Sequence, residues 1–453
     1  MSQAVRSADP QTSVAGLPRT GRLWVPPFRF SERIPPSRLS FSLRTGGIPR
    51  STVSAFVLLR AAALAQATLE RAPRHETLNE SISDAGRRVT PAELRAQRPL
   101  SPAADRRIPS LDGLRAISIG LVVLSHLAGT ERSPINGRVA DILPLGELGV
   151  RVFFVISGFL ITNLLLDEWN RYGTISLSRF YFRRTFRILP PYYTLILVVA
   201  IGAFLQLIRL APADLVHAVT YSSNYYAQRS WWVGHTWSLA VEEQFYLLWP
   251  AVLLLAGRRG AFAVATAVVV ISPFVRLVLW HFAASNTNGI GHGFETVADS
   301  LAIGCLLAGL ASWLIAQSWY RRMLASPAFL LVPLIVLAAS AFHEHPRVYF
   351  FASFTLMNVG AALCVHWAVM YHKGVVGRFL NARPVAFVGV ISYSIYLWQQ
   401  LFLNRYSQSA LATFPLNIIL MAIASLASFY LVERPSLATR HRLEVRLFPR
   451  RRG

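Results

Sequence analysis

Ten apolar runs, each long enough to cross a bilayer, constrain this 453-residue chain more than any other feature. A membrane-spanning helix needs about 20 mostly apolar residues, because the hydrocarbon core is about 30 Å thick. The composition agrees, with 53% hydrophobic and only 15% charged residues. The sequence therefore predicts an all-α, polytopic membrane bundle with helices at 111–128, 148–166, 190–208, 238–256, 261–282, 297–316, 327–342, 349–371, 384–403 and 412–432.

The arginines between these runs predict the topology. If the N-terminus is cytoplasmic, most loop arginines and Lys373 fall on inside loops, as the positive-inside rule requires. Both termini are then cytoplasmic. We expect a basic, mostly disordered tail at residues 1–105, a membrane domain at 106–435 and a basic tail at 436–453. A mis-assigned start site is the alternative explanation of the first segment. Loops and tails also account for the net charge of +23.

Two polar residues interrupt the first apolar run. Arg115 and His126 are eleven residues apart, so on a helix they share one face, separated by about 16 Å of rise. Ionisable groups in a membrane helix usually face the bundle interior and mark a substrate path. By the expected topology Arg115 is near the cytoplasmic end and His126 near the opposite end. A neutral His126 could serve as a general base, and the alternative is an interfacial histidine bonded to a loop carbonyl.

Adjacent carboxylates, Glu242 and Glu243, lie about one turn inside the predicted fourth helix, at a depth comparable to that of His126. Their burial is costly unless they are paired or hydrogen-bonded. One could orient the imidazole of His126, and the other could join Tyr246 or Arg276 in a structural network. Neighbouring residues diverge by about 100° on a helix, so only one is expected to face His126. We favour Glu242, and a pair that only ties helices together is the alternative.

A third cluster precedes the predicted third helix. Arginines alternate there with aromatic residues in the segment SRFYFRRTFRILPPYY, at Arg179, Arg183, Arg184 and Arg187. Guanidinium groups bind phosphates in bidentate fashion, and neighbouring aromatics could stack on a purine. The segment predicts a cytoplasmic phosphate-bearing ligand, of which acyl-coenzyme A is one, while contact with lipid headgroups is the alternative. The sequence contains no P-loop, GxGxxG, zinc or GxSxG motif.

Several ordered motifs resemble one known family. The segments LDGLRAISIGLVVLSHL, GELGVRVFFVISGFLIT, RFYFRRTFRILPPYY, HTWSLAVEEQFYLLWP, ISYSIYLW and VERP resemble the membrane acyltransferase-3 family, which includes bacterial O-antigen and exopolysaccharide acetylases. The resemblance runs from about Ile108 to Pro435. It implies a ten-helix enzyme of the bacterial inner membrane that moves an acyl group, often acetyl, from cytoplasmic acyl-CoA to a hydroxyl of an envelope carbohydrate such as lipopolysaccharide.

The resemblance also implies roles for individual residues. The family's Arg-x10-His motif falls on Arg115 and His126, with His126 as catalytic base or acyl relay. Its Arg-x-x-Arg motif falls on Arg184 and Arg187, which would engage coenzyme A together with Arg183. Its WSLxxExxFY element includes Glu242 and Tyr246. Secondary candidates are Asp112, Glu243, Tyr246 and Asp299. No metal or permanently bound cofactor is expected.

The chain departs from the family pattern at two places. Many relatives read YLWH where this chain has Tyr396-Leu397-Trp398-Gln399, so an amide that cannot act as a base replaces the histidine. Relatives often have Thr-Arg-x-Asp where this chain has Thr296-Val297-Ala298-Asp299, so the arginine is missing. With no C-terminal hydrolase-like domain, it resembles the stand-alone kind of relative.

Two other functions remain open. A transporter or flippase of an acylated or lipid-linked sugar could use His126 and the carboxylates as a proton relay. The strongly basic composition alone raises nucleic-acid binding, which we do not expect.

Overall fold

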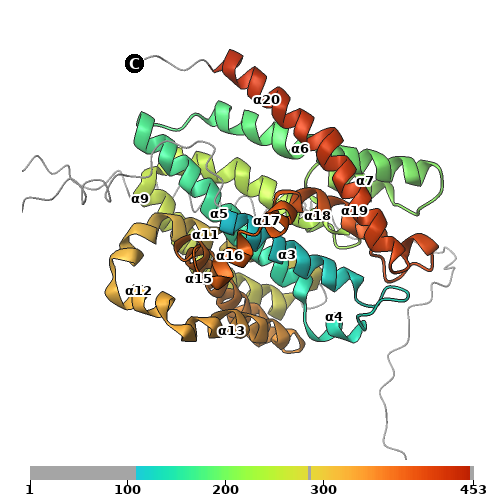
Figure 1. Ribbon diagram of the computed structural model, residues 1–453, viewed down its shortest axis with the longest axis horizontal. Coiled ribbons are helices and arrows are strands. Elements are labelled where there is room, and N and C mark those ends of the chain that lie inside the picture. The colour runs from blue at the N-terminus through green and yellow to red at the C-terminus, as the bar shows by residue number, and fades with distance from the viewer. Residues whose placement is uncertain (1–108, 284–286, 449–453) are drawn as a thin grey trace, which may run out of the picture. The chain divides into compact units, whose positions relative to one another are not determined.

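Helices are the only regular secondary structure in this computed structural model within residues 109–283 and 287–448, the part that it describes (Figure 1). The all-α prediction is confirmed for that part. The predicted tail at 1–105 lies outside the described residues.

The principal helices are α3 (Pro109–Leu127), α5 (Leu145–Tyr172), α6 (Leu177–Phe204), α9 (Thr236–Phe282), α11 (Phe294–Ala316), α13 (Leu331–Ser340), α15 (Phe354–Met370), α17 (Arg383–Val390), α18 (Ser392–Phe402), α19 (Leu416–Ser428) and α20 (Arg434–Leu447). Shorter helices between them are α4 (Arg138–Ile142), α7 (Pro212–Val219), α8 (Trp231–Gly234), α10 (Thr287–His292), α12 (Ser318–Ala325), α14 (Pro346–Val348) and α16 (Val375–Leu380). Short 3-10 helices are η1 (Ser223–Tyr225), η2 (Pro327–Leu330), η3 (Ala341–Glu344) and η5 (Ala410–Ala412). Single π-helical turns are η4 (Tyr349–Ser353) and η6 (Phe429–Glu433).

The described residues contain eight helical segments long and apolar enough to span a membrane, or nine if α17 and α18 form one bent span. These two helices meet at an angle of 71°, so the run predicted at 384–403 is broken rather than straight. The runs predicted at 238–256 and 261–282 are merged in α9, whose 47 residues contain a non-helical Gly257 at φ 66° and ψ 178°. The count reaches ten only if α9 crosses twice, and ten therefore stays a prediction.

Glycines let the central helices approach closely. A Cβ on Gly158 of α5 would lie 2.1 Å from the carbonyl oxygen of Leu301, and one on Gly304 of α11 would lie 2.2 Å from that of Val155. No side chain fits at either point, so the two backbones touch. Small residues serve this purpose in membrane helices, where association depends on close van der Waals packing.

Helix α3 is held in the same way. A Cβ on Gly389 of α17 would lie 1.8 Å from the carbonyl oxygen of Asp112, and Gly113 meets the backbone of Leu380. α17 is fixed against the start of α3, and the bend after Val390 turns the axis of α18 away from that of α17. That bend brings α18 to the other end of α3.

Helix α20 runs beside α6 (red and green in Figure 1). The guanidinium of Arg179 donates to the carbonyl oxygen of Phe448 at 3.1 Å, and Arg183 Nε donates to Glu444 Oε1 at 2.7 Å. The predicted boundary between residues 435 and 436 therefore falls inside a helix that packs on the bundle. Its attachment depends on Glu444, whose carboxylate pairs with Arg183.

Candidate active site

His126 lies in the last turn of α3 and is enclosed by residues from α8 and α18. Its Nδ1 is 2.6 Å from Oε1 of Gln399, which is fully buried. The edge of its ring meets Trp231, with ring centroids 5.4 Å apart. The predicted active-site histidine is therefore a half-buried residue with one ring nitrogen engaged by a neutral amide.

The surroundings of His126 are themselves tied together. Trp231 Nε1 donates to the carbonyl oxygen of Gln400 at 2.9 Å, and Gln400 Nε2 donates back to the carbonyl oxygen of Trp231. A Cβ on Gly234 would lie 2.7 Å from Gln400 Nε2, so a side chain at this position would displace the end of the Gln400 side chain. Arg405 donates to the carbonyl oxygen of Ser125 at 2.7 Å, which fixes the end of α3.

Glu242 lies elsewhere in the bundle. Its Oε1 accepts hydrogen bonds from Ser157 Oγ on α5 and from Tyr246 OH at 3.2 Å. The residue that contacts His126 from this part of the chain is Trp231, eleven positions before Glu242. The prediction that Glu242 orients the ring of His126 is therefore wrong, whereas a comparable depth of the two residues stays a prediction. Hydroxyl groups compensate this carboxylate, and Gln399 takes the position beside the imidazole.

The arginines at the start of the bundle gather around Glu242. Arg115 forms an ion pair with Asp112 at 3.6 Å and interacts electrostatically with Arg187, Glu242 and Tyr246. The guanidinium carbon of Arg184 lies 4.9 Å from the centre of the Tyr246 ring, and its charge also interacts with both Glu242 and Glu243. We name this set, with Glu433, the charged cluster; its members are Arg115, Arg184, Arg187, Glu242, Glu243, Tyr246 and Glu433.

Glu433 joins the cluster from the π-helical turn η6. It is 2% exposed and accepts a hydrogen bond from Ser394 Oγ at 3.1 Å. Its charge interacts with those of Arg187 and Arg115. Glu433 is not among the site residues predicted from the sequence, although a carboxylate next to an apolar run is a usable signal. A π-helical turn often occurs at a functional site.

Arg183 does not point into the charged cluster. Its side chain pairs with Glu444 on α20, and Arg179 bonds to the backbone of the same helix. The structure thus separates the four predicted arginines into two pairs. Arg184 and Arg187 belong to the charged cluster, and Arg179 and Arg183 contact α20. Any contact of Arg183 with acyl-CoA stays a prediction.

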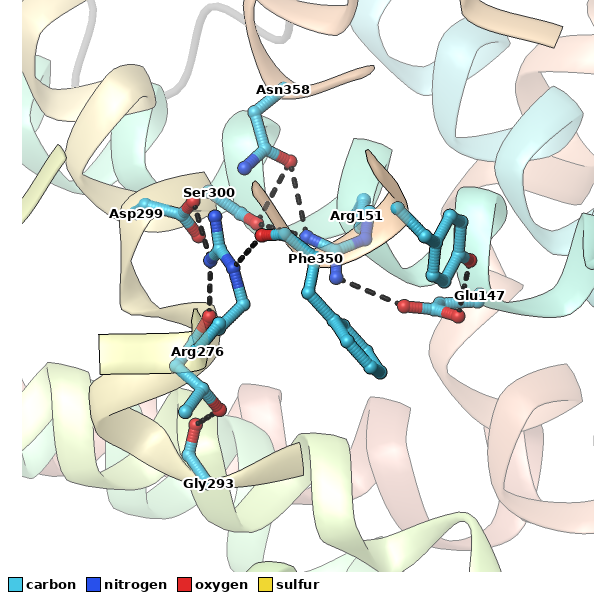
Figure 2. Close-up of polar contacts among 10 residues, drawn as sticks. Glu147, Arg151, Arg276, Gly293, Asp299, Ser300, Phe350 and Asn358 are labelled. Atoms are coloured by element: carbon cyan, nitrogen blue, oxygen red, sulfur yellow. Dashed lines mark hydrogen bonds and ion pairs between the residues drawn. The ribbon is translucent and has the colours of Figure 1, made fainter. Parts of the chain in front are cut away.

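Asp299 belongs to a separate network, shown in Figure 2. Its Oδ2 accepts from Arg276 Nη1 at 2.8 Å, and both side chains are fully buried. Arg276 also donates to the carbonyl oxygen of Phe350 in η4. Although the Thr-Val-Ala-Asp segment of α11 lacks the arginine of the family pattern, Asp299 forms an ion pair with Arg276 of α9.

The same network continues to α5. Arg151 donates to Glu147 Oε1 at 2.9 Å and to Ser300 Oγ at 3.3 Å, and Ser300 Oγ donates to Asn358 Oδ1 at 2.9 Å (Figure 2). Two arginines face two carboxylates here, so the buried charges balance, and full pairing is what makes buried charge tolerable. The network joins residues of five elements, α5, α9, α11, η4 and α15. None of the contacts given for it involves His126.

One further cation lies on a connection outside the spanning helices. Arg229 donates to the carbonyl oxygens of Tyr226 and Ser223, at 2.8 and 3.1 Å, and to His292 Nδ1 at 3.0 Å. Burial lowers the pKa of Arg229 to about 10, so it stays protonated at neutral pH. Among the described residues no group of three or more His, Cys, Asp or Glu side chains could hold a metal ion.

Comparison with known proteins identifies the family. The family model described as an acyltransferase domain, Acyl_transf_3, matches residues 108–434. The chain belongs to this acyltransferase-3 family. The resemblance expected from the motifs is therefore confirmed, as is the classification as an acyltransferase at the level of the family.

Individual relatives are more distant. The chain is similar to the O-acetyltransferase OatA of Staphylococcus aureus, with 29% identity over 73% of this chain and 57% of the relative. It is similar to the putative peptidoglycan O-acetyltransferase YrhL of Bacillus subtilis, with 27% identity over 73% and 55% of the two chains. Identity to the peptidoglycan O-acetyltransferase OatA of Listeria monocytogenes is 26%, over 64% and 48%.

The chain spans about half the length of these curated relatives. No solved structure matches it. The names of two of these relatives specify peptidoglycan as the acceptor, and none of the three names lipopolysaccharide.

Proposed function

We propose that this protein is a multi-pass membrane O-acyltransferase that moves an acyl group, acetyl in the first instance, from acyl-CoA to a hydroxyl of an envelope carbohydrate. Membership of the acyltransferase-3 family supports the reaction, and the names of the relatives favour peptidoglycan as the acceptor. The cytoplasmic membrane of a bacterium is the location in which this donor and this acceptor face opposite sides.

The observation that carries the proposal is the arrangement along α3. His126 at one end has a single ring nitrogen engaged, by Gln399, and Arg115 nearer the other end belongs to the charged cluster with Arg184 and Arg187. Guanidinium groups suit the phosphates of coenzyme A, and a neutral imidazole suits proton removal from a hydroxyl. In the proposed reaction the donor's phosphates bind at the arginines and its thioester extends along α3 to His126.

The roles of the residues follow from this placement. His126 acts as general base or as acyl relay, because both reactions require an uncharged ring nitrogen. Arg184 and Arg187 bind the donor, and Glu242 keeps the positive charge of the cluster compensated within the bundle.

The test uses the full chain in lipid nanodiscs with acetyl-CoA and soluble peptidoglycan fragments. We expect free CoA to appear only when the acceptor is present, with acetyl esters on the fragments detected by mass spectrometry. His126→Ala and Arg187→Ala should lose this release by at least about a hundredfold, as expected for loss of a general base or an essential binding contact.

His281→Ala is the matched control, because His281 is an exposed histidine at the end of α9 outside the site. It should leave CoA release unchanged. Normal turnover by His126→Ala would contradict the assigned role. Movement of a lipid-linked sugar across the membrane without thioester cleavage would instead favour a transporter.

A further inference from the structure

The contact between His126 and Gln399 restricts the protonation of the imidazole. The atom facing Nδ1 is the amide oxygen of Gln399, at 2.6 Å. An amide oxygen has only lone pairs and accepts hydrogen bonds without donating. With the amide in this orientation Nδ1 carries the hydrogen, and in the neutral ring the lone pair is then on Nε2.

The geometry around this contact is held from several sides. Gln399 is fully buried on α18, and the next residue, Gln400, is bonded to the backbone of Trp231 on α8. Trp231 in turn meets the ring of His126 with its planes inclined by 71°. Arg405 fixes the carbonyl of Ser125 and with it the end of α3 that carries the ring, while Nε2 of Gln399 has no hydrogen-bond partner among the described residues.

We propose that Gln399 is a positioning residue that holds His126 in the Nδ1–H tautomer and so assigns the acyl-transfer chemistry to Nε2. This inference rests on the proposed function. An amide is suited to the task because it accepts the Nδ1 hydrogen bond and does not take up the proton itself.

In the resulting step, Nε2 of His126 takes up one proton and gives it back. Nε2 of His126 removes the proton from the acceptor hydroxyl, and the oxygen of that hydroxyl attacks the carbonyl carbon of the thioester. A carbon–oxygen bond forms and the carbon–sulfur bond breaks. The imidazolium then returns the proton from Nε2 to the departing thiolate of coenzyme A. The Nδ1 hydrogen stays bonded to Gln399 throughout.

The tautomer is measurable without donor or acceptor. The full chain, labelled with ¹⁵N-histidine in nanodiscs, is compared by ¹⁵N–¹H correlation NMR with His126→Asn, which identifies the signals of His126. We expect the wild type to show protonated Nδ1 and unprotonated Nε2 at a pH where the ring is neutral. A wild-type His126 that carries its hydrogen on Nε2 would overturn the proposal.

Variants at position 399 separate positioning from packing. Gln399→Met fills a similar volume and removes the acceptor, so it should lose the Nδ1–H signature and lower kcat by about tenfold or more. Gln399→Glu keeps an acceptor oxygen and should retain the signature and a larger share of the activity. Gln317→Met, at a glutamine whose amide bonds only to the carbonyl oxygen of Trp313 in the contacts given for it, is the control and should retain the signature.

The outcomes distinguish this inference from the proposed function. Wild-type kcat in Gln399→Met, or an unchanged tautomer in that variant, would overturn the role of Gln399 while leaving acyl transfer intact. If Gln399→Met fails to fold, as judged by size-exclusion chromatography, the wild-type tautomer and the comparison with Gln399→Glu still decide. An Nδ1–H tautomer in a protein that never releases CoA would contradict only the proposed reaction.

Discussion

The two adjacent carboxylates of α9 have different surroundings, although they are neighbours in the chain. Glu242 accepts hydrogen bonds from two hydroxyl groups, whereas Oε1 of Glu243 has no hydrogen-bond partner among the described residues. Both interact with the charge of Arg184. Glu242 is thus built into the site through α5 as well as α9.

We therefore predict unequal effects of the two amide substitutions. Glu242→Gln removes a charge that interacts with Arg115 and Arg184 and disturbs two hydrogen bonds, so it should lower the turnover of acetyl-CoA about tenfold more than Glu243→Gln does. Initial rates of CoA release from matched nanodisc samples provide the comparison. Equal losses would show that the site does not discriminate between the two.

Glu433 provides a second prediction for a single side chain. Its buried carboxylate interacts with the charges of Arg187 and Arg115, which are half-buried, so Glu433→Gln leaves two like charges with less compensation. We expect a loss of stability of about 1–3 kcal/mol, seen as a lower thermal denaturation midpoint. Glu344→Gln, at an exposed position, serves as the control and should not change the midpoint. An unchanged midpoint for Glu433→Gln would refute this role.

The sequence could identify the unusual side chains of the site but not their partners. Arg115, His126 and Glu242 are conspicuous because each interrupts an apolar run. The contact between His126 and Gln399 joins residues 273 positions apart, and no local pattern predicts such a pairing. For the same reason, the sequence shows Gln399 only as a replacement for the histidine of the YLWH motif. The structure shows that its amide contacts the imidazole of His126.

Close helix packing leads to a prediction for α5 and α11. Gly304→Ala would place a methyl group against the backbone of Val155, which cannot move aside as a side chain can. We expect destabilisation of about 1–3 kcal/mol, the usual range for overpacking. Gly120→Ala on α3 is the matched control, because nothing lies within 4 Å of its Cβ position. Thermal denaturation followed by size-exclusion chromatography compares the two, and equal midpoints would contradict the packing argument.

Helix boundaries could be predicted where hydrophobicity alone determines them. They could not be predicted where tertiary contacts determine them. The run at 384–403 is mostly apolar, yet it bends by 71° because α17 is held against α3 while α18 continues toward His126. The packing of the residues after 435 was equally hidden, since it involves contacts with α6 such as the ion pair between Glu444 and Arg183.

For the bundle as a whole, the crossing of α9 decides the topology. We predict that Arg259→Cys and Lys373→Cys react with a membrane-impermeant maleimide from the cytoplasmic side, and Arg138→Cys and His281→Cys from the opposite side. All four positions are exposed, and Cys305 and Cys364 are replaced by alanine beforehand. Labelling of Arg259→Cys and His281→Cys from the same side would show that the second half of α9 does not cross the membrane, and would rule out ten spans.

The ion pair between Arg276 and Asp299 has a consequence for how the protein is made. Each of these groups is costly in hydrocarbon by itself, and both are fully buried in the finished bundle. Their helices follow one another in the chain, separated by α10. If the second half of α9 entered the bilayer before α11, the charge of Arg276 would lie in hydrocarbon without its counter-ion Asp299. We therefore expect this part of α9 and α11 to enter the bilayer together as a hairpin, with the charge of Arg276 already paired with that of Asp299. Asp299→Asn should then impair the membrane insertion of α9, and not only acyl transfer by the inserted protein.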